Sequence, residues 1–165
     1  MTEIVRVFRD EVPAMRFIGK KYADYSGWGE WFANGWFDAV EAAMGGPGAI
    51  LALWENGGGY CGLERRGEDG SFEYRIGMFT PAGTEVPEGF DCVDFPAGAF
   101  GTAWIYGPEN EVHGAIPGCR AAVEAAGMRI RREGGVWSFE NGLCPRFTTP
   151  DEKGNVILDY CFVLD

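Results

Sequence analysis

The second half of the chain repeats the pattern of the first. Residues 1–82 and residues 89–165 each read as an extended segment, a helix and two strands joined by a turn. The expected strand pairs are Tyr60–Arg66 with Ser71–Thr80, and Val136–Phe147 with Asn155–Leu164. Two copies of a strand–helix–strand–strand unit can share one sheet and leave a groove on the pseudo-twofold axis between them. The predicted fold is therefore α+β, a single domain with an antiparallel sheet, helices on one face and a ligand cleft between the halves.

The helix of the first half is expected over about residues 27–44. Ser26 is a suitable N-cap, and the glycines that begin at Gly45 are typical of a helix end. At 100° per residue, Trp31 is expected at the edge of the polar side. The apolar face is expected to consist of Trp28, Phe32, Trp36, Val40 and Ala43.

The other elements are interrupted by prolines. Residues 3–22 alternate in polarity and predict one long, bent strand with Pro13 at a sheet edge. Residues 90–106 predict a second long strand that breaks near Pro96. The second helix is expected over about residues 109–126, where Pro117 either kinks the helix or restarts it at Gly118.

The charge of the chain argues against contact with nucleic acid. The formal net charge is −11, and the isoelectric point is about 4.5. Affinity for nucleic acid comes mainly from Lys and Arg side chains, and the single basic cluster of Arg129, Arg131 and Arg132 is too small to reverse this field. An acidic surface instead favours cationic ligands, because its negative electrostatic potential attracts them toward the protein. Aromatic residues make up 15% of the chain, and those that the core does not need are available to line a pocket.

The cysteine spacing predicts neither a metal site nor a disulfide framework. The five cysteines are far apart, form no C-x-x-C motif and are odd in number. Reduced cysteines favour a cytoplasmic location. No secretion leader and no apolar run of membrane-spanning length is recognised, so we expect no membrane association. We also expect no cofactor.

Glu140 is the acidic residue that stands out. It follows Val136-Trp137-Ser138-Phe139 in a strongly β-prone run, where a carboxylate needs a partner or an exposed face. The alternative is that strand alternation places Glu140 on a solvated face. Glu73 follows Phe72 in the same way and is interpreted as its symmetry mate, with a solvated face as the stronger reading. His113, the only histidine, is expected to be a solvated helix residue rather than a catalytic base.

The segment Tyr74–Gly107 resembles the centre of GyrI-like small-molecule-binding domains. The resemblance rests on an Ile76-Gly77 step, the connection Val86-Pro87-Glu88-Gly89-Phe90, the Pro96-Ala97-Gly98 motif and an aromatic stretch that closes at Gly107. The end of the chain, SFEN followed by VILDYCFVL, resembles the final hairpin of these domains. The family includes effector-binding domains of AraC-type and multidrug-responsive regulators, integron-associated proteins and a gyrase inhibitor.

The resemblance implies an aromatic cleft in which a glutamate of the penultimate strand meets lipophilic cations. Glu140 occupies that position, while Gly142 stands where relatives often carry a tyrosine. The expected ligand-binding residues are Glu140, Trp36, Tyr74, Trp104 and Tyr160. The leading hypothesis is a stand-alone cytoplasmic binding protein for aromatic or cationic small molecules, and any transcriptional role would need a separate DNA-binding partner.

Two alternatives stay open. In the first, the protein is a small hydrolase in which Glu140 activates water and Tyr160 or Tyr74 protonates the leaving group. In the second, it is an inhibitory or scaffolding protein whose acidic surface binds a basic partner.

Overall fold

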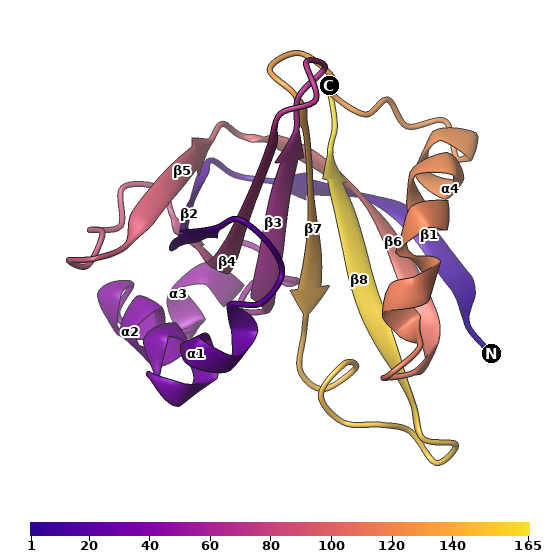
Figure 1. The fold of residues 1–165 in the computed structure, drawn as a ribbon, viewed down its shortest axis with the longest axis horizontal. Helices are drawn as coiled ribbons and strands as arrows, with labels where there is room; N and C mark the ends of the chain where they lie inside the picture. The colour runs from indigo at the N-terminus through magenta and orange to yellow at the C-terminus, as the bar shows by residue number, and fades with distance from the viewer.

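Eight strands form one antiparallel sheet in the order β1-β6-β8-β7-β3-β4-β2-β5 (Figure 1). The computed structural model describes residues 1–165. The strands are β1 (Glu3–Val12), β2 (Met15–Tyr22), β3 (Tyr60–Arg66), β4 (Phe72–Pro81), β5 (Asp91–Phe95), β6 (Gly98–Pro108), β7 (Val136–Gly142) and β8 (Asn155–Val163). The predicted fold class is confirmed.

The strand order is the same when read outward from the centre in either direction. On one side the order is β3, β4, β2 and β5, and on the other it is β7, β8, β6 and β1. The strands β4 and β8 therefore hold equivalent positions, as the sequence repeat predicts. The outermost strands are exchanged: β1 pairs with β6 of the second half, and β5 pairs with β2 of the first.

Two predicted long strands are each divided in two. Pro13 lies between β1 and β2, so residues 3–22 form separate strands at distant places in the sheet rather than one bent strand. The predicted break near Pro96 is confirmed, because β5 ends at Phe95 and β6 begins at Gly98. In both cases a proline, which has no N–H to donate, marks the point where the chain leaves one ladder for another.

The helix expected over residues 27–44 is two helices, α1 (Trp28–Ala33) and α2 (Trp36–Ala43). They are separated at Gly35, whose φ of 64° is left-handed. This break shifts the helical phase, so Trp31 is fully buried while Phe32 is 61% exposed. The prediction that Phe32 faces the core and Trp31 the polar side was therefore wrong.

The second helical segment also has two parts. A 3₁₀ helix, η1 (Val112–Gly118), contains Pro117 and is followed by α4 (Cys119–Ala125). The prediction that the helix restarts after Pro117 is confirmed. A further short helix, α3 (Gly48–Leu51), leads toward β3. None of the helices is both long enough and apolar enough to span a membrane.

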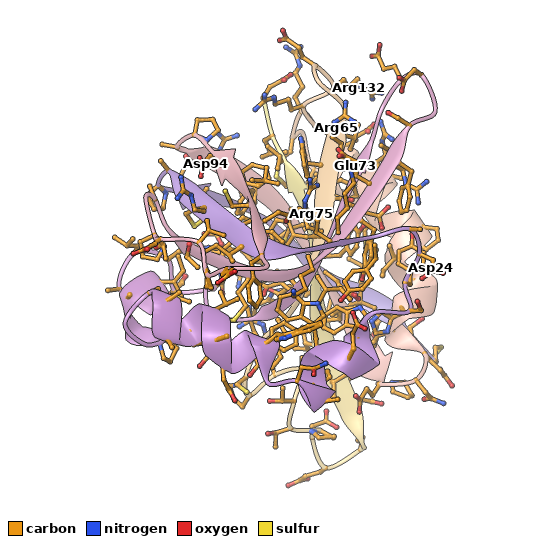
Figure 2. The ribbon with its side chains drawn as sticks, turned by 60° about the vertical axis from the view of Figure 1, so that its left-hand side comes forward. Asp24, Arg65, Glu73, Arg75, Asp94 and Arg132 are labelled. Atoms are coloured by element: carbon orange, nitrogen blue, oxygen red, sulfur yellow. The ribbon has the colours of Figure 1, made fainter.

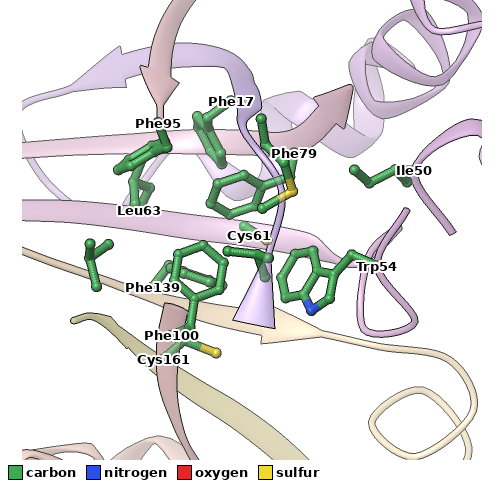
Figure 3. Close-up of a cluster of buried hydrophobic side chains, with 13 residues drawn as sticks. Phe17, Ile50, Trp54, Cys61, Leu63, Phe79, Phe95, Phe100, Phe139 and Cys161 are labelled. Atoms are coloured by element: carbon green, nitrogen blue, oxygen red, sulfur yellow. The ribbon is translucent and has the colours of Figure 1, made fainter. Parts of the chain in front are cut away.

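One face of the sheet carries an aromatic core (Figure 3). Phe79 packs against five other rings, with centroid distances of 4.9 Å to Phe139 and 5.2 Å to Phe17. Central and outer strands both contribute to this cluster, and Ile50 of α3 and Trp54 complete it. Side chains that alternate with this cluster point to the opposite face.

The opposite face is covered by helices of both halves. Val40 and Phe37 of α2 pack with Ile76 and Met78 of β4. In the second half, Cys119 and Val123 of α4 pack in a cluster with residues of β6 and β8. The two helical layers leave the middle of this face, over β3 and β7, open between them (Figure 1).

Candidate functional site

A cavity of about 710 Å³ lies over the central strands, between the helical layers of the two halves. Its floor comes from β3, β4, β7 and β8, and its walls come from the start of α1 on one side and from η1 and α4 on the other. The lining residues are Tyr25, Trp28, Gly62, Glu64, Arg66, Tyr74, His113, Ile116, Pro117, Arg120, Val136, Ser138, Glu140, Tyr160 and Phe162.

The floor of the cavity carries the same glutamate–tyrosine pair twice. Glu64 is opposite Tyr74 in the β3–β4 register, and Glu140 is opposite Tyr160 in the β7–β8 register. Each glutamate is the fifth residue of its strand. The side chains of Glu64 and Glu140 are 14% and 17% exposed. The pseudo-twofold axis therefore places two mostly buried carboxylates in one cavity.

Glu73 is not the symmetry mate of Glu140. Glu73 lies on β4 and alternates with Tyr74, so its side chain leaves the cavity floor on the other side of the sheet. There it accepts a hydrogen bond from Lys21 and lies near Arg65 and Arg75 (Figure 2). The hydrogen bond from Lys21 lowers the pKa of the Glu73 carboxyl. The repeated Phe-Glu step was misleading because its two copies lie on strands that are not equivalent.

The two cavity carboxylates have different partners. Arg66 Nε donates to Oε2 of Glu64 at 2.9 Å, within β3. Nε2 of His113, from η1, lies 2.8 Å from Oε2 of Glu140. This hydrogen bond raises the pKa of His113 against the opposing effect of burial. Glu64 is thus paired with a permanent cation and Glu140 with a group that titrates near neutral pH.

The two floor tyrosines are held by different donors. Trp28 Nε1 donates to the Tyr74 hydroxyl oxygen at 2.8 Å, which orients the indole at the cavity wall. The Tyr160 hydroxyl and Ser138 Oγ are 2.9 Å apart and share a hydrogen bond. Burial raises the pKa of both tyrosines, and the carboxylate Glu140 adds to this effect at Tyr74. Both hydroxyls therefore remain protonated over the range in which most proteins function.

Gly62 is the point where two polar groups of the cavity converge. A Cβ at this position would lie 2.8 Å from Oε1 of Glu140 and closer still to the Tyr74 hydroxyl oxygen. The equivalent position in β7 is Ser138, which carries a side chain. The absence of a side chain at Gly62 therefore lets Tyr74 and Glu140 face the same small volume.

Of the five expected ligand-binding residues, the cavity contains Glu140, Tyr74 and Tyr160. The expectation that Trp104 lines the same cleft as Tyr160 was wrong. Trp104 pairs with Asp159, the neighbour of Tyr160, so it points to the opposite face of the sheet. There its ring lies between the guanidinium groups of Arg6 and Arg146, each 4.8 Å from the centroid.

Trp36 also lies outside the cavity. It begins α2, and its ring is 4.3 Å from Nζ of Lys20 and in edge contact with Trp31. Trp28, which was expected in the core, is the first residue of the short helix α1. It packs partly buried against the core cluster and also lines the cavity wall. The aromatic wall is therefore formed by Trp28 and Tyr25, beside Tyr74 of the floor.

The ring of Phe147 packs beside Gly142. A Cβ on Gly142 would lie 3.1 Å from Cδ1 of Phe147. The Phe147 ring also meets the His113 ring edge to face, with centroids 6.3 Å apart. The absence of a side chain at Gly142 thus makes room for Phe147, a ring from the following loop, beside the histidine that contacts Glu140.

Sequence reasoning missed three of the residues that shape the site. Glu64 gave a usable signal, since it occupies the position in the first repeat that Glu140 occupies in the second. His113 gave none beyond being the only histidine, and Trp28 was expected in the core alone, whereas it packs against the core cluster and also lines the cavity. No three His, Cys, Asp or Glu side chains gather as a metal-binding cluster.

No protein-family model matches the chain, and no curated protein matches it either. Solved structures do match. A candidate bacterial transcription regulation protein from Staphylococcus aureus MU50 has a TM-score of 0.64 and 13% identity, over 97% of this chain and 98% of that chain. SAV2435 bound to tetraphenylphosphonium has a TM-score of 0.59 and 12% identity, over 98% and 94% of the two chains. A hydrolase from Listeria innocua has a TM-score of 0.52 and 11% identity, over 97% and 92%.

These matches cover nearly the whole of each chain, but the identities are low. They establish that the chain shares its complete architecture with these proteins, while the chemistry of each site depends on its own residues. The fold of this protein is the one that the resemblance to GyrI-like effector-binding domains predicts.

Proposed function

We propose that this protein is a single GyrI-like domain that binds aromatic, lipophilic cations in the cavity between its halves. The observation that carries the proposal is the position of Glu140, a mostly buried carboxylate on an aromatic cavity floor. Such a group needs a positive partner, and a ligand can supply one. Glu64 adds a second carboxylate on the same floor.

The cavity suits this class of ligand in size and in surface. Its volume of about 710 Å³ falls within the range of about 300–1,000 Å³ that is usual for small-molecule sites. Trp28 and Tyr25 present rings at one wall and Tyr74 presents its ring on the floor, and a cation over such a ring gains roughly 0.5–2 kcal/mol. Apolar surroundings also strengthen the attraction between a carboxylate and a cation. The similarity in fold to a protein bound to tetraphenylphosphonium supports that ion as a first probe.

We further propose that the protein acts in the cytoplasm and that any link to transcription runs through a separate DNA-binding protein. All five cysteines are free, which suits a reducing compartment. A net charge of −11 opposes direct contact with DNA. Within this proposal the chain supplies the ligand response, and the partner supplies the contact with nucleic acid.

Tetraphenylphosphonium should quench the tryptophan fluorescence of this protein, because the Trp28 indole lies at the cavity wall. Replacing Trp28 with Phe should remove most of the quench while preserving a ring at the wall. Trp104→Phe is the matched control, since Trp104 lies on the opposite face of the sheet. Retention of the full quench in Trp28→Phe, or its loss in Trp104→Phe, would contradict the placement of the ligand in this cavity.

A second candidate function is hydrolysis of an electrophilic small molecule. The convergence of the Tyr74 hydroxyl and the Glu140 carboxylate above Gly62 favours it, since a protonated phenol and a carboxylate facing one point can act as acid and base. Incubation with reactive esters and strained electrophiles, followed by mass spectrometry, tests this candidate. Product formed by the wild type and lost in Tyr74→Phe would establish it, whereas stoichiometric binding without product favours the binding function.

A further inference from the structure

The two symmetry-related carboxylates of the cavity differ in how their charge is balanced. Arg66 neutralises Glu64 from the same strand and keeps its charge at every pH of interest. In the second half the residue equivalent to Arg66 is Gly142, the last residue of β7, so Glu140 has no such partner within its own strand. His113 reaches Glu140 from η1 instead, and its side chain is 51% exposed.

We propose that His113 is a specificity-determining residue that serves as the built-in counter-ion of Glu140, so that a cationic ligand binds by displacing the imidazolium. This inference rests on the proposed binding function and adds the selectivity of the same site. In the free protein, protonated His113 donates from Nε2 to Glu140. When a cation takes its place against the carboxylate, the imidazole loses this partner and releases its proton to water.

The position of His113 favours displacement over a permanent contact. It lies on a 3₁₀ helix at the rim of the cavity, its side chain is half exposed, and its ring makes an edge contact with Phe147. Because the imidazolium is half exposed, water screens its attraction to the mostly buried Glu140 and weakens the ion pair. A lipophilic cation that also contacts the aromatic wall can therefore displace the imidazolium from Glu140. A small hydrated cation lacks these aromatic contacts, so its binding free energy is too small to displace the imidazolium.

His113 is the group on this wall that changes charge between pH 6 and pH 8.5. Carboxyl, phenol and guanidinium groups ordinarily titrate outside this range. Besides His113, the titratable groups that line the cavity are Tyr25, Glu64, Arg66, Tyr74, Arg120, Glu140 and Tyr160. Outside the cavity, Glu109 acts on His113 in the same direction as Glu140.

The sign of the pH effect follows from this competition. The contact with Glu140 raises the pKa of His113 in the free protein, so the imidazole is more often protonated before the ligand binds than after. Binding of a cation then releases a proton, and linkage requires the affinity to fall as the pH falls through that pKa. A neutral aromatic ligand leaves the ion pair intact and should show no such dependence.

The test compares wild type, His113→Gln and Arg120→Gln, with tetraphenylphosphonium and neutral triphenylphosphine oxide as probes. The glutamine variant keeps a neutral donor near the place of Nε2. Arg120→Gln removes a positive charge from the same wall without touching the contact with Glu140. Calorimetry between pH 6.0 and 8.5, in buffers of different ionisation enthalpy, gives both the affinity and the number of protons released.

For the wild type we expect the affinity for tetraphenylphosphonium to fall about tenfold from pH 8.5 to pH 6.0, with release of a fraction of a proton. His113→Gln should vary less than about twofold, bind more tightly than the wild type at pH 6.0 and release no proton. Arg120→Gln should keep the wild-type pH dependence.

Two failures are distinguishable. If the wild type and His113→Gln bind the cation with the same pH dependence, the role of His113 is overturned while the binding function stands. If neither binds the cation at any pH, both the function and this inference are overturned. The single histidine also gives one set of imidazole signals in NMR spectra. An unchanged His113 pKa on saturation with the cation would contradict displacement directly.

Discussion

Replacing Trp31 with alanine should lower the free energy of unfolding by about 3–5 kcal/mol, the usual cost of truncating a buried aromatic side chain. Trp31 is fully buried. Its ring lies 4.7 Å from Phe37 and 5.7 Å from both Trp36 and Phe90, centroid to centroid. The cavity left by the indole adds to the loss of apolar burial. Urea denaturation followed by far-ultraviolet circular dichroism measures the change.

The neighbouring Phe32 is the matched control. It lies in the same helix, but its side chain is 61% exposed, so Phe32→Ala should cost less than about 1 kcal/mol. The two variants together test the break at Gly35. Equal losses of stability at both positions would contradict the difference in burial between Trp31 and Phe32. A larger loss for Phe32→Ala would support the single long helix that the sequence pattern predicts, in which Phe32 faces the core.

Glu140→Gln should weaken binding of tetraphenylphosphonium by about 1.5–3 kcal/mol, the range for interactions that involve a charged group. This corresponds to a loss of about tenfold to 150-fold in affinity. The substitution keeps the shape of the side chain and removes the charge that faces the ligand. Binding of triphenylphosphine oxide should change far less, because a neutral ligand has no use for the carboxylate. Calorimetry with both ligands gives the difference.

Glu73→Gln provides the control for net charge. It removes one negative charge from the opposite face of the sheet, where Glu73 lies among Lys21, Arg65 and Arg75 (Figure 2). Its effect on cation binding should be small. Comparable losses in both variants would show that the cation responds to the overall acidic field, and equal losses for charged and neutral ligands would return Glu140 to a packing role.

Much of the fold follows from local patterns. Alternation and glycine-containing turns placed β3 correctly and β4 and β8 within one residue at each end, and the repeat predicted their equivalent positions. The buried and exposed faces of the helices could not be predicted from local patterns. A single left-handed residue, Gly35, resets the helical phase, and periodicity across it then assigns Trp31 and Phe32 to the wrong sides. Glycine permits this conformation without requiring it, so the sequence alone does not place the break.

The candidate site was predictable where alternation along a single strand decides to which face of the sheet a side chain points. Glu140, Tyr74 and Tyr160 lie on the cavity floor, as expected. Trp104 was misplaced because the relative phase of neighbouring strands depends on their register, which sets Trp104 opposite Asp159 rather than Tyr160. The contact between His113 and Glu140 joins η1 to β7 across 26 intervening residues, and no local pattern reports it.

The exchange of outer strands means that the cavity forms only when both halves of the chain are folded together. Because β1 pairs with β6 and β5 with β2, neither half of the chain contains a complete four-stranded unit. The floor itself depends on pairing between β3 and β7, whose residues lie far apart in sequence. Non-local pairings of this kind form late and slowly, since the entropy of closing long loops is lost before any contact is gained. We therefore expect a chain cleaved between its halves to lose the cavity, so that ligand recognition reports the integrity of the whole molecule.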